Sequence, residues 1–164
     1  QGLSEAIAAS AISVTAILMA VGSVAWGWVV ERLPARFALA GVALIMAVAS
    51  PAFITADTVA EAYIYAGLFG FALSGLLVVP PVAYADYYGR RSLGTIRGIT
   101  EPFMSLGQAV GAVTSGLIYD VTDSYTIAFW TFSAIGIATA IAVILARQPT
   151  QTAATVAVTR TQIK

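Results

Sequence analysis

Five long apolar runs dominate this chain and leave few folds open to it. They cover residues 6–30, 37–55, 62–85, 99–119 and 127–146. Each run is near or above the roughly 20 residues that an α-helix needs to cross a hydrocarbon core of ~30 Å. A membrane-spanning strand would need only about 9–11 residues with strict alternation, which none of the runs shows. The runs therefore predict an all-α, polytopic membrane helix bundle with five transmembrane helices.

Composition agrees with this class and narrows the chemistry. The chain is 59% hydrophobic and 10% charged, with a mean hydropathy of +0.88, whereas a soluble domain carries about 25% charged residues. It contains no Cys and no His, which removes thiolate and imidazole groups from any site. We therefore expect no catalytic residue, no metal and no cofactor, and a membrane enzyme is the least favoured class. The dispersed bases predict no nucleic-acid partner.

The basic residues alternate along the chain. All eight lie in the gaps after the first, third and fifth runs, and the other gaps and the N-terminus contain none; they are Arg32, Arg36, Arg90, Arg91, Arg97, Arg147, Arg160 and Lys164. Cytoplasmic loops of membrane proteins retain Lys and Arg during insertion. The alternation predicts an N-terminus outside the cell and a cytoplasmic C-terminus. Residues 147–164, which have little to bury, are expected to be a disordered cytoplasmic tail.

The apolar runs differ in polarity. The stretch 37–53 has no polar side chain before Ser50, which suits a helix largely surrounded by lipid. The first, third and fourth runs contain Ser, Thr, Gly and Gln, and polar groups in a bilayer usually face other helices or a wet cavity. We expect those three helices to be the interior ones.

Two charged segments lie where the first and third runs end. Gly27 is followed by Glu31, Arg32 and Arg36. One interpretation of this pattern is a plain helix end with stop-transfer charges. The second segment, 86–98, is expected to be a long inner loop and contains Asp86, Arg90, Arg91 and Arg97.

These segments, with Ser115–Asp120 at the end of the fourth run, resemble the major facilitator superfamily. The monocarboxylate and oxalate/formate-type bacterial carriers are the most similar branches that we can name. The resemblance implies helices eight to twelve of a twelve-helix carrier of the bacterial inner membrane. It also implies transport of a small-molecule substrate by alternating access, with a coupling proton as a candidate co-substrate. The carrier's N-terminal half would be the missing partner, and the two charged segments would act as cytoplasmic gates.

Small residues recur one helical turn apart in three of the runs. They form three sets: Ser23 and Gly27; Gly67, Gly70 and Ser74; and Gly107, Gly111 and Ser115. Such spacing lets helix backbones approach closely in a bilayer. Plain packing is the favoured interpretation, and sliding of helices during transport is the alternative. Pro80 and Pro81 predict a bend in the third helix.

A few polar residues lie within the runs. Gln108, Ser105, Ser74 and Thr15 are candidates for lining a substrate path. Glu101, near the start of the fourth run, is a candidate for proton coupling or gating. Its alternative role is a structural ion pair with Arg97, Arg90 or Arg91.

Substrate identity is not encoded in these runs. No Lys or Arg lies inside any of them, so the counter-charge for an anionic substrate would have to come from elsewhere. The chain begins with Gln1 and enters an apolar run almost at once, which leads us to expect a fragment that cannot transport alone. The alternative function is a small, non-transporting integral membrane subunit or scaffold.

Overall fold

The computed structural model describes residues 5–89 and 93–146, and these residues form five long helices. Their bounds are α1 (Glu5–Arg32), α2 (Ala35–Ala52), a 3₁₀ turn η1 (Phe53–Thr55), α3 (Val59–Tyr88), α4 (Leu93–Thr122) and α5 (Thr126–Leu145). No strand occurs among the described residues. The all-α membrane bundle that the apolar runs predict is confirmed.

Local chemistry sets the ends of two helices. Pro34 lies in extended backbone (φ −51°, ψ 133°) directly before α2. Its ring also disfavours helix in the preceding residue, Leu33, and α1 ends at Arg32. Thr58 caps α3: its hydroxyl accepts the Glu61 N–H at 3.2 Å, and the Glu61 carboxylate accepts the Thr58 N–H at 3.0 Å. Such a reciprocal capping box satisfies backbone donors that the first helical turn leaves free.

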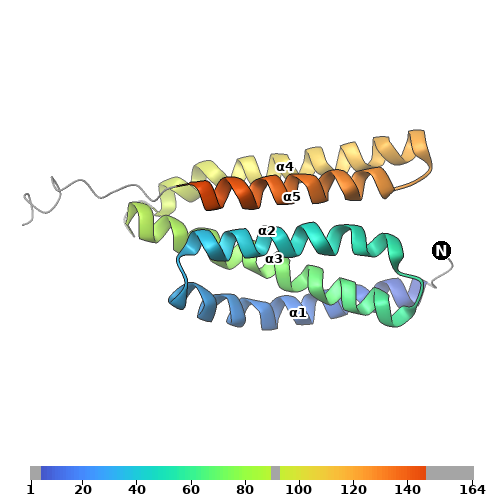
Figure 1. The fold of residues 1–164 in the computed structure, drawn as a ribbon, viewed down its shortest axis with the longest axis horizontal. Helices are drawn as coiled ribbons and strands as arrows, with labels where there is room; N and C mark the ends of the chain where they lie inside the picture. Colours follow the sequence, from blue (N-terminus) through green and yellow to red (C-terminus); the bar gives the residue numbers. More distant parts are fainter. Residues whose placement is uncertain (1–4, 90–92, 147–164) are drawn as a thin grey trace, which may run out of the picture.

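The helices run side by side, with α3 in the middle of the bundle (Figure 1). It packs against α1 on one side and α2 on the other, and α2 packs in turn against α5. The contacts of α4 with α3 and α5 are slight. The core cluster joins α1, α2 and α3 through Trp26, Ala38, Val42 and Val79.

The prediction that the second helix is mostly surrounded by lipid is wrong. α2 lies between α3 and α5, and Val42 and Ala49 are fully buried. A helix that is apolar all round can be covered by protein as well as by lipid. The alanines of α2 also let its neighbours approach closely. By contrast, α4 was expected inside the bundle, yet none of its residues, all of which the structure describes, is buried.

The predicted inner loop 86–98 is also largely wrong. α3 continues through Pro80 and Pro81 to Tyr88, and α4 begins at Leu93. Gly89, with a φ of 78°, ends α3. The two prolines therefore do not end the helix, and most of the charged segment is helical. Arg90 and Arg91 lie outside the described residues.

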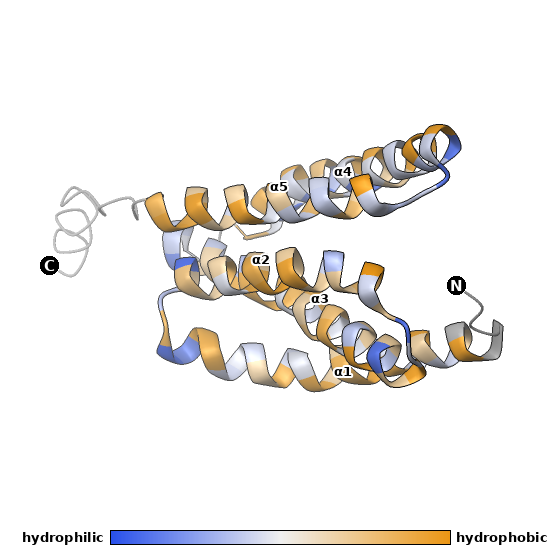
Figure 2. Cartoon of the chain, turned by 45° about the vertical axis from the view of Figure 1, so that its right-hand side comes forward, coloured by the Kyte–Doolittle hydropathy of each residue, from blue (hydrophilic) through white to orange (hydrophobic). Residues whose placement is uncertain are grey.

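Four of the helices are long and apolar enough to cross a membrane: α1, α2 with η1, α3 and α5. Hydrophobic residues cover these helices, and the hydrophilic ones concentrate near their ends (Figure 2). α4 has 30 residues but is the least apolar of the five. A fifth span therefore stays a prediction, as does the tail 147–164, which lies outside the described residues.

Candidate functional site

Charged residues separate to the two ends of the bundle. Arg32, Arg36 and Arg97 lie where α1 ends and α2 and α4 begin, an end that we name the basic end (Figure 1). The opposite end, which we name the acidic end, holds four carboxylates among the described side chains: Asp57, Glu61, Asp120 and Asp123. The basic residues that alternate along the sequence thus gather at one end of the bundle, because successive helices run in opposite directions.

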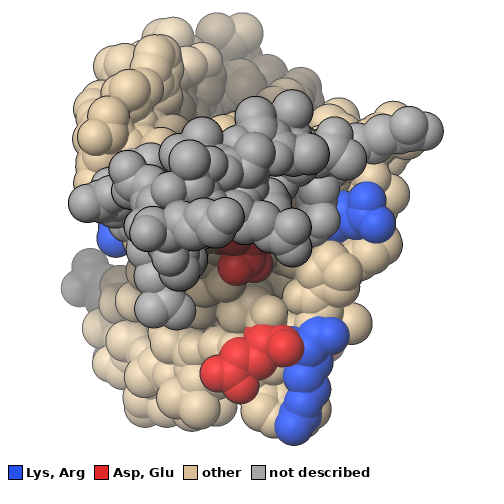
Figure 3. Space-filling model, turned by 90° about the vertical axis from the view of Figure 1, so that its left-hand side faces the viewer, with Lys and Arg blue, Asp and Glu red and all other residues tan. Residues whose placement is uncertain are grey.

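The basic end brings the first gating candidates together without pairing them. Figure 3 shows this end, with basic and acidic side chains on its surface. Arg32 lies over the ring of Trp28 at 3.7 Å, and Arg36 over that of Phe37 at 4.7 Å. Glu31, Arg32 and Asp86 are exposed and form no ion pair with another described residue.

Two further candidates, Arg97 and Glu101, do pair. The Arg97 guanidinium donates to the Glu101 carboxylate at 2.8 Å, one helical turn apart, with both side chains about half exposed. The structural ion pair considered for Glu101 is therefore present. Beside it lies a cavity of about 30 Å³ between α4 and the Pro80–Pro81 segment of α3, which is room for about one water molecule.

The closest helix contact is between α1 and α3. A Cβ at Gly70 would overlap the carbonyl oxygen of Thr15, and one at Gly22 would overlap the hydroxyl of Ser74. These glycines are needed because α1 and α3 touch through their backbones. Gly27, by contrast, has no atom outside its own helix within 4 Å of such a Cβ among the described residues.

Two of the four substrate-path candidates take part in this contact. The Thr15 hydroxyl donates to the carbonyl of Ala66 at 3.2 Å, and to that of Ala11 at 3.0 Å in its own helix. Ser74 is fully buried, and its hydroxyl donates to the Phe71 carbonyl at 2.7 Å. Both hydroxyls support packing in this structure, and their part in a substrate path stays a prediction.

Trp26 is the main residue of the contact that the sequence did not single out. It is only 5% exposed, and its indole N–H donates to the Phe71 carbonyl at 2.9 Å. Its ring also lies 5.5 Å from that of Phe71. Gly75 on α3 leaves room for the indole, because it has no side chain where Trp26 packs. The sequence contains both residues, but only the fold shows that they are in contact.

The other two candidates, Ser105 and Gln108, lie on α4. Both are exposed, and neither forms a side-chain hydrogen bond with another described residue. Gly107 and Gly111 on the same helix likewise have no neighbour outside α4 within 4 Å of an added Cβ, among the residues described. These groups are free to meet a solute or another helix.

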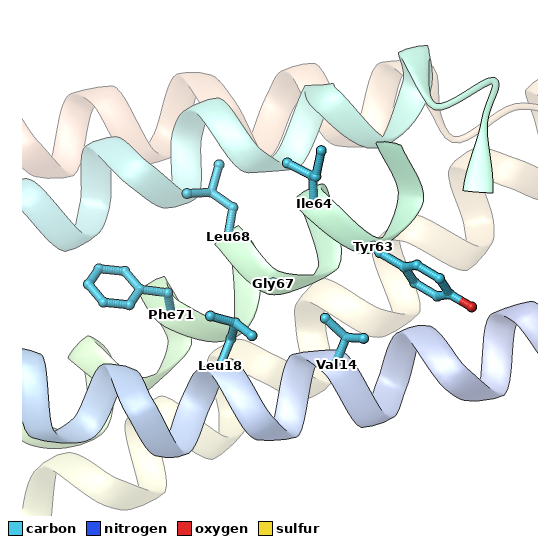
Figure 4. A pocket seen from close by; sticks show the side chains of 7 residues that line it. All are labelled: Val14, Leu18, Tyr63, Ile64, Gly67, Leu68 and Phe71. Atoms are coloured by element: carbon cyan, nitrogen blue, oxygen red, sulfur yellow. The ribbon is translucent and has the colours of Figure 1, made fainter. Parts of the chain in front are cut away.

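An open groove of about 500 Å³ also follows α1 and α3. Val14 and Leu18 of α1 point toward α3 near Gly67, with Ile64 and Leu68 further along the groove (Figure 4). Its one polar side chain, Tyr63, shares a hydrogen bond of 2.7 Å with Ser10. An apolar groove without a free polar group does not suit a charged solute. Within the described residues, no group of acidic side chains could hold a metal ion.

The fold, the length of the apolar helices and the charged ends together define a polytopic helical membrane protein. Comparison with known proteins gives the family: residues 1–162 match the model of the Major Facilitator Superfamily, to which the chain belongs. The chain is 32% identical over 130 residues to Monocarboxylate transporter 13 of Rattus norvegicus. That match covers 74% of this chain and 29% of the relative's length. No solved structure matches.

Proposed function

We propose that this chain is part of a secondary transporter that moves small solutes across a membrane by alternating access. The observation that carries the proposal is the family match over nearly the whole chain. The name of the similar rat protein supports small monocarboxylates as the substrate class. The alternative, a non-transporting subunit or scaffold, is less favoured because the family and the named relative both favour transport.

A second part of the proposal is that the five helices are the eighth to twelfth of a longer carrier. The match covers 29% of the relative's length, which supports a longer protein. The assignment to the eighth to twelfth helices rests on the resemblance of the segments 27–36 and 86–98 to the family. Helices outside this chain would then pack on α4. Its uncovered glycines at 107 and 111 suit such close contact. Ser105 and Gln108 would line the substrate path between the two halves, and the counter-charge for a carboxylate would come from outside these helices.

Transport by the complete protein tests the proposed activity. Reconstituted in liposomes, it should take up a radiolabelled monocarboxylate such as lactate, and unlabelled lactate should compete. Liposomes without protein give the background. Uptake no greater than this background for a set of short monocarboxylates would contradict the substrate class. Uptake of another small solute instead would support the proposed transport activity and change only the proposed substrate.

The charged groups of the basic end are proposed to hold the cytoplasmic side closed in one transport state. The described candidates are Glu31, Arg32, Arg36, Asp86, Arg97 and Glu101, with Gly27 one turn before Glu31 in α1; Arg90 and Arg91 are candidates from the sequence and lie outside the described residues. Because Glu31 and Asp86 are unpaired among the described residues, they are free to pair in another state. Glu31→Gln and Asp86→Asn should therefore lower the maximal transport rate and leave KM nearly unchanged. A pure rise in KM, or wild-type kinetics in both variants, would argue against a gate.

Orientation is part of the same proposal: the basic end faces the cytoplasm of a bacterial cell and the acidic end faces outward. The chain has no cysteine of its own, so the labelling of an added cysteine is measured as the increase over the parent protein. A membrane-impermeant maleimide on intact cells should label Asp57→Cys and spare Glu31→Cys. Labelling of Glu31→Cys instead would reverse the topology. Proton coupling stays open to a test by transport at different pH.

A further inference from the structure

The acidic end contains a second candidate site, which is separate from the charged groups of the basic end and from the α1–α3 contact. An open pocket of about 410 Å³ lies between η1 and the turn that joins α4 to α5. Four aromatic rings line it: Phe53 from η1, Tyr119 from α4, and Tyr125 and Phe129 from the start of α5. One carboxylate, that of Asp123, lines it as well. Two segments that are distant in the sequence, η1 and the α4–α5 turn with its flanking residues, therefore meet around one aromatic and acidic space.

The rings hold one another in place. Tyr119 and Tyr125 stack with centroids 4.5 Å apart, and Phe53 and Phe129 stack at 6.4 Å. Tyr125 also contacts Phe129 at 6.4 Å, so the two pairs are linked. Aromatic faces carry negative partial charge, which attracts cations, and a ring fixed by its neighbours loses little entropy when a ligand binds.

The turn that carries Asp123 is also well organised. Asp123 has a positive φ of 51°, a conformation that Asp tolerates better than most residues. Its backbone N–H donates to the Tyr119 carbonyl at 2.8 Å. The Thr122 hydroxyl donates to the carbonyl of Ser124 at 2.9 Å. The carboxylate itself has no hydrogen-bond or ion-pair partner among the described residues, so it is available to a ligand.

The charges around the pocket favour a cation. No Lys or Arg lies in the sequence gaps that form the acidic end. All of them follow the first, third or fifth apolar run. Asp57, Glu61 and Asp120 share the acidic end with Asp123, and together these carboxylates attract positive charge. Glu61 is already used, because its carboxylate accepts the N–H groups of Asp57 and Thr58. Asp123 is the acid that lines the pocket.

We propose that this pocket binds an alkylammonium group, with the aromatic faces around the alkyl substituents and Asp123 as the counter-charge. A small organic amine and the headgroup of a choline lipid both carry that chemistry. The competing explanation is that the rings are only interfacial anchors, since Tyr and Trp are enriched at membrane surfaces. Anchoring requires no carboxylate and predicts no saturable binding.

The test measures binding of tetramethylammonium chloride to the complete protein by isothermal titration calorimetry, in a detergent without an ammonium headgroup. Sodium chloride at equal ionic strength is the blank. We expect saturable binding that Asp123→Asn weakens about fivefold and that Tyr125→Leu weakens by a similar factor. Tyr125→Phe keeps the ring, so it should stay within about twofold of the wild type. Asn also tolerates a positive φ, so Asp123→Asn retains the turn.

Asp57→Asn is the matched control, because it removes the same charge from the same end but does not line the pocket. It should bind as the wild type does. Nanodiscs distinguish the two sources of ligand. If a lipid headgroup occupies the site, tetramethylammonium should bind more weakly in phosphatidylcholine than in phosphatidylglycerol nanodiscs. If the ligand is a free amine, phosphatidylcholine should not block the probe. No saturable binding, or equal weakening by Asp57→Asn and Asp123→Asn, would overturn the proposal.

Discussion

The face of α3 that carries Gly67 and Gly70 is packed against α1, whereas Gly107 and Gly111 on α4 meet no described residue outside their own helix. Both helices have small residues at similar spacing. Small residues permit a close approach, but without a hydrophobic force between helices in lipid they do not choose the partner. The α1–α3 contact also has interhelical hydrogen bonds from Thr15 and Trp26. Hydrogen bonds between helices thus distinguish the filled face from the open one, because the described hydroxyl bonds of α4 stay within that helix or its flanking turn.

The largest expected effect comes from filling the close contact. Gly70→Ala places a methyl group against the backbone of Thr15 and should lower the free energy of unfolding by about 2–3 kcal/mol, because overpacking forces backbones apart. Denaturation of the complete protein in detergent, followed by circular dichroism, measures this change. Gly98→Ala on α4 has open space around it and should be neutral or slightly stabilising. Equal stability of the two variants would remove the difference between the faces.

The second effect concerns the indole of Trp26. Trp26→Phe loses its hydrogen bond to the Phe71 carbonyl and part of the buried volume, which together should cost about 2 kcal/mol. Trp130→Phe is the control, since that side chain is 60% exposed and its replacement should matter little. The same denaturation measurement applies. Should Trp130→Phe prove as costly as Trp26→Phe, the assignment of the core to α1, α2 and α3 would be incorrect.

A smaller effect is expected from a single interhelical hydroxyl. Thr15→Val keeps the shape of the side chain and removes its bond to Ala66 on α3, at a cost of about 0.6 kcal/mol. Thr114→Val removes a hydroxyl that bonds only to carbonyls of its own helix among the described residues. We expect no measurable loss there. A greater loss in Thr114→Val would show that α4 relies on its hydroxyls more than the α1–α3 contact does.

The smallest effect is expected at the start of α4. Arg97 and Glu101 are about half exposed and one turn apart, so a double-mutant cycle with Arg97→Gln and Glu101→Gln should give a coupling of about 0.3–0.5 kcal/mol that decreases with salt. Thermal unfolding at low and high ionic strength measures it. A coupling several times larger and insensitive to salt would mean that the pair is desolvated by groups outside the described residues.

Much of the fold was predictable because the length of the apolar runs determines how many helices form and where they lie in the chain. Apolar stretches of about 20 residues and Pro34 predict the helices and the first break between them. The prediction of a loop at 86–98 was wrong because glycines and charged residues, which are frequent in loops, recur there, although α3 and α4 extend into the segment. The burial of α2 was missed for another reason: an apolar surface shows no difference between lipid and protein as its neighbour.

The candidate site was predictable only in part. The alternation of basic residues predicted that they gather at one end of the bundle, and the spacing of Gly67 and Gly70 predicted a close helix contact. The roles of Thr15, Ser74 and Trp26 were not readable, because each depends on a partner about 45 or more residues away or on burial that only packing creates. Gln108 and Ser105 remain predictions for the same reason: their neighbours do not lie among the described residues.

The central claim is that α4 presents its glycines to a part of the carrier outside this chain. The unfolding free energy of Gly111→Leu in the complete protein tests it most directly, with Gly98→Leu as the control. No described residue outside α4 lies within 4 Å of a Cβ at either position, so a leucine is harmless unless a further helix packs there. We expect Gly111→Leu to lower the free energy of unfolding by about 2 kcal/mol and Gly98→Leu to change it little. Unchanged stability of Gly111→Leu would contradict the central claim.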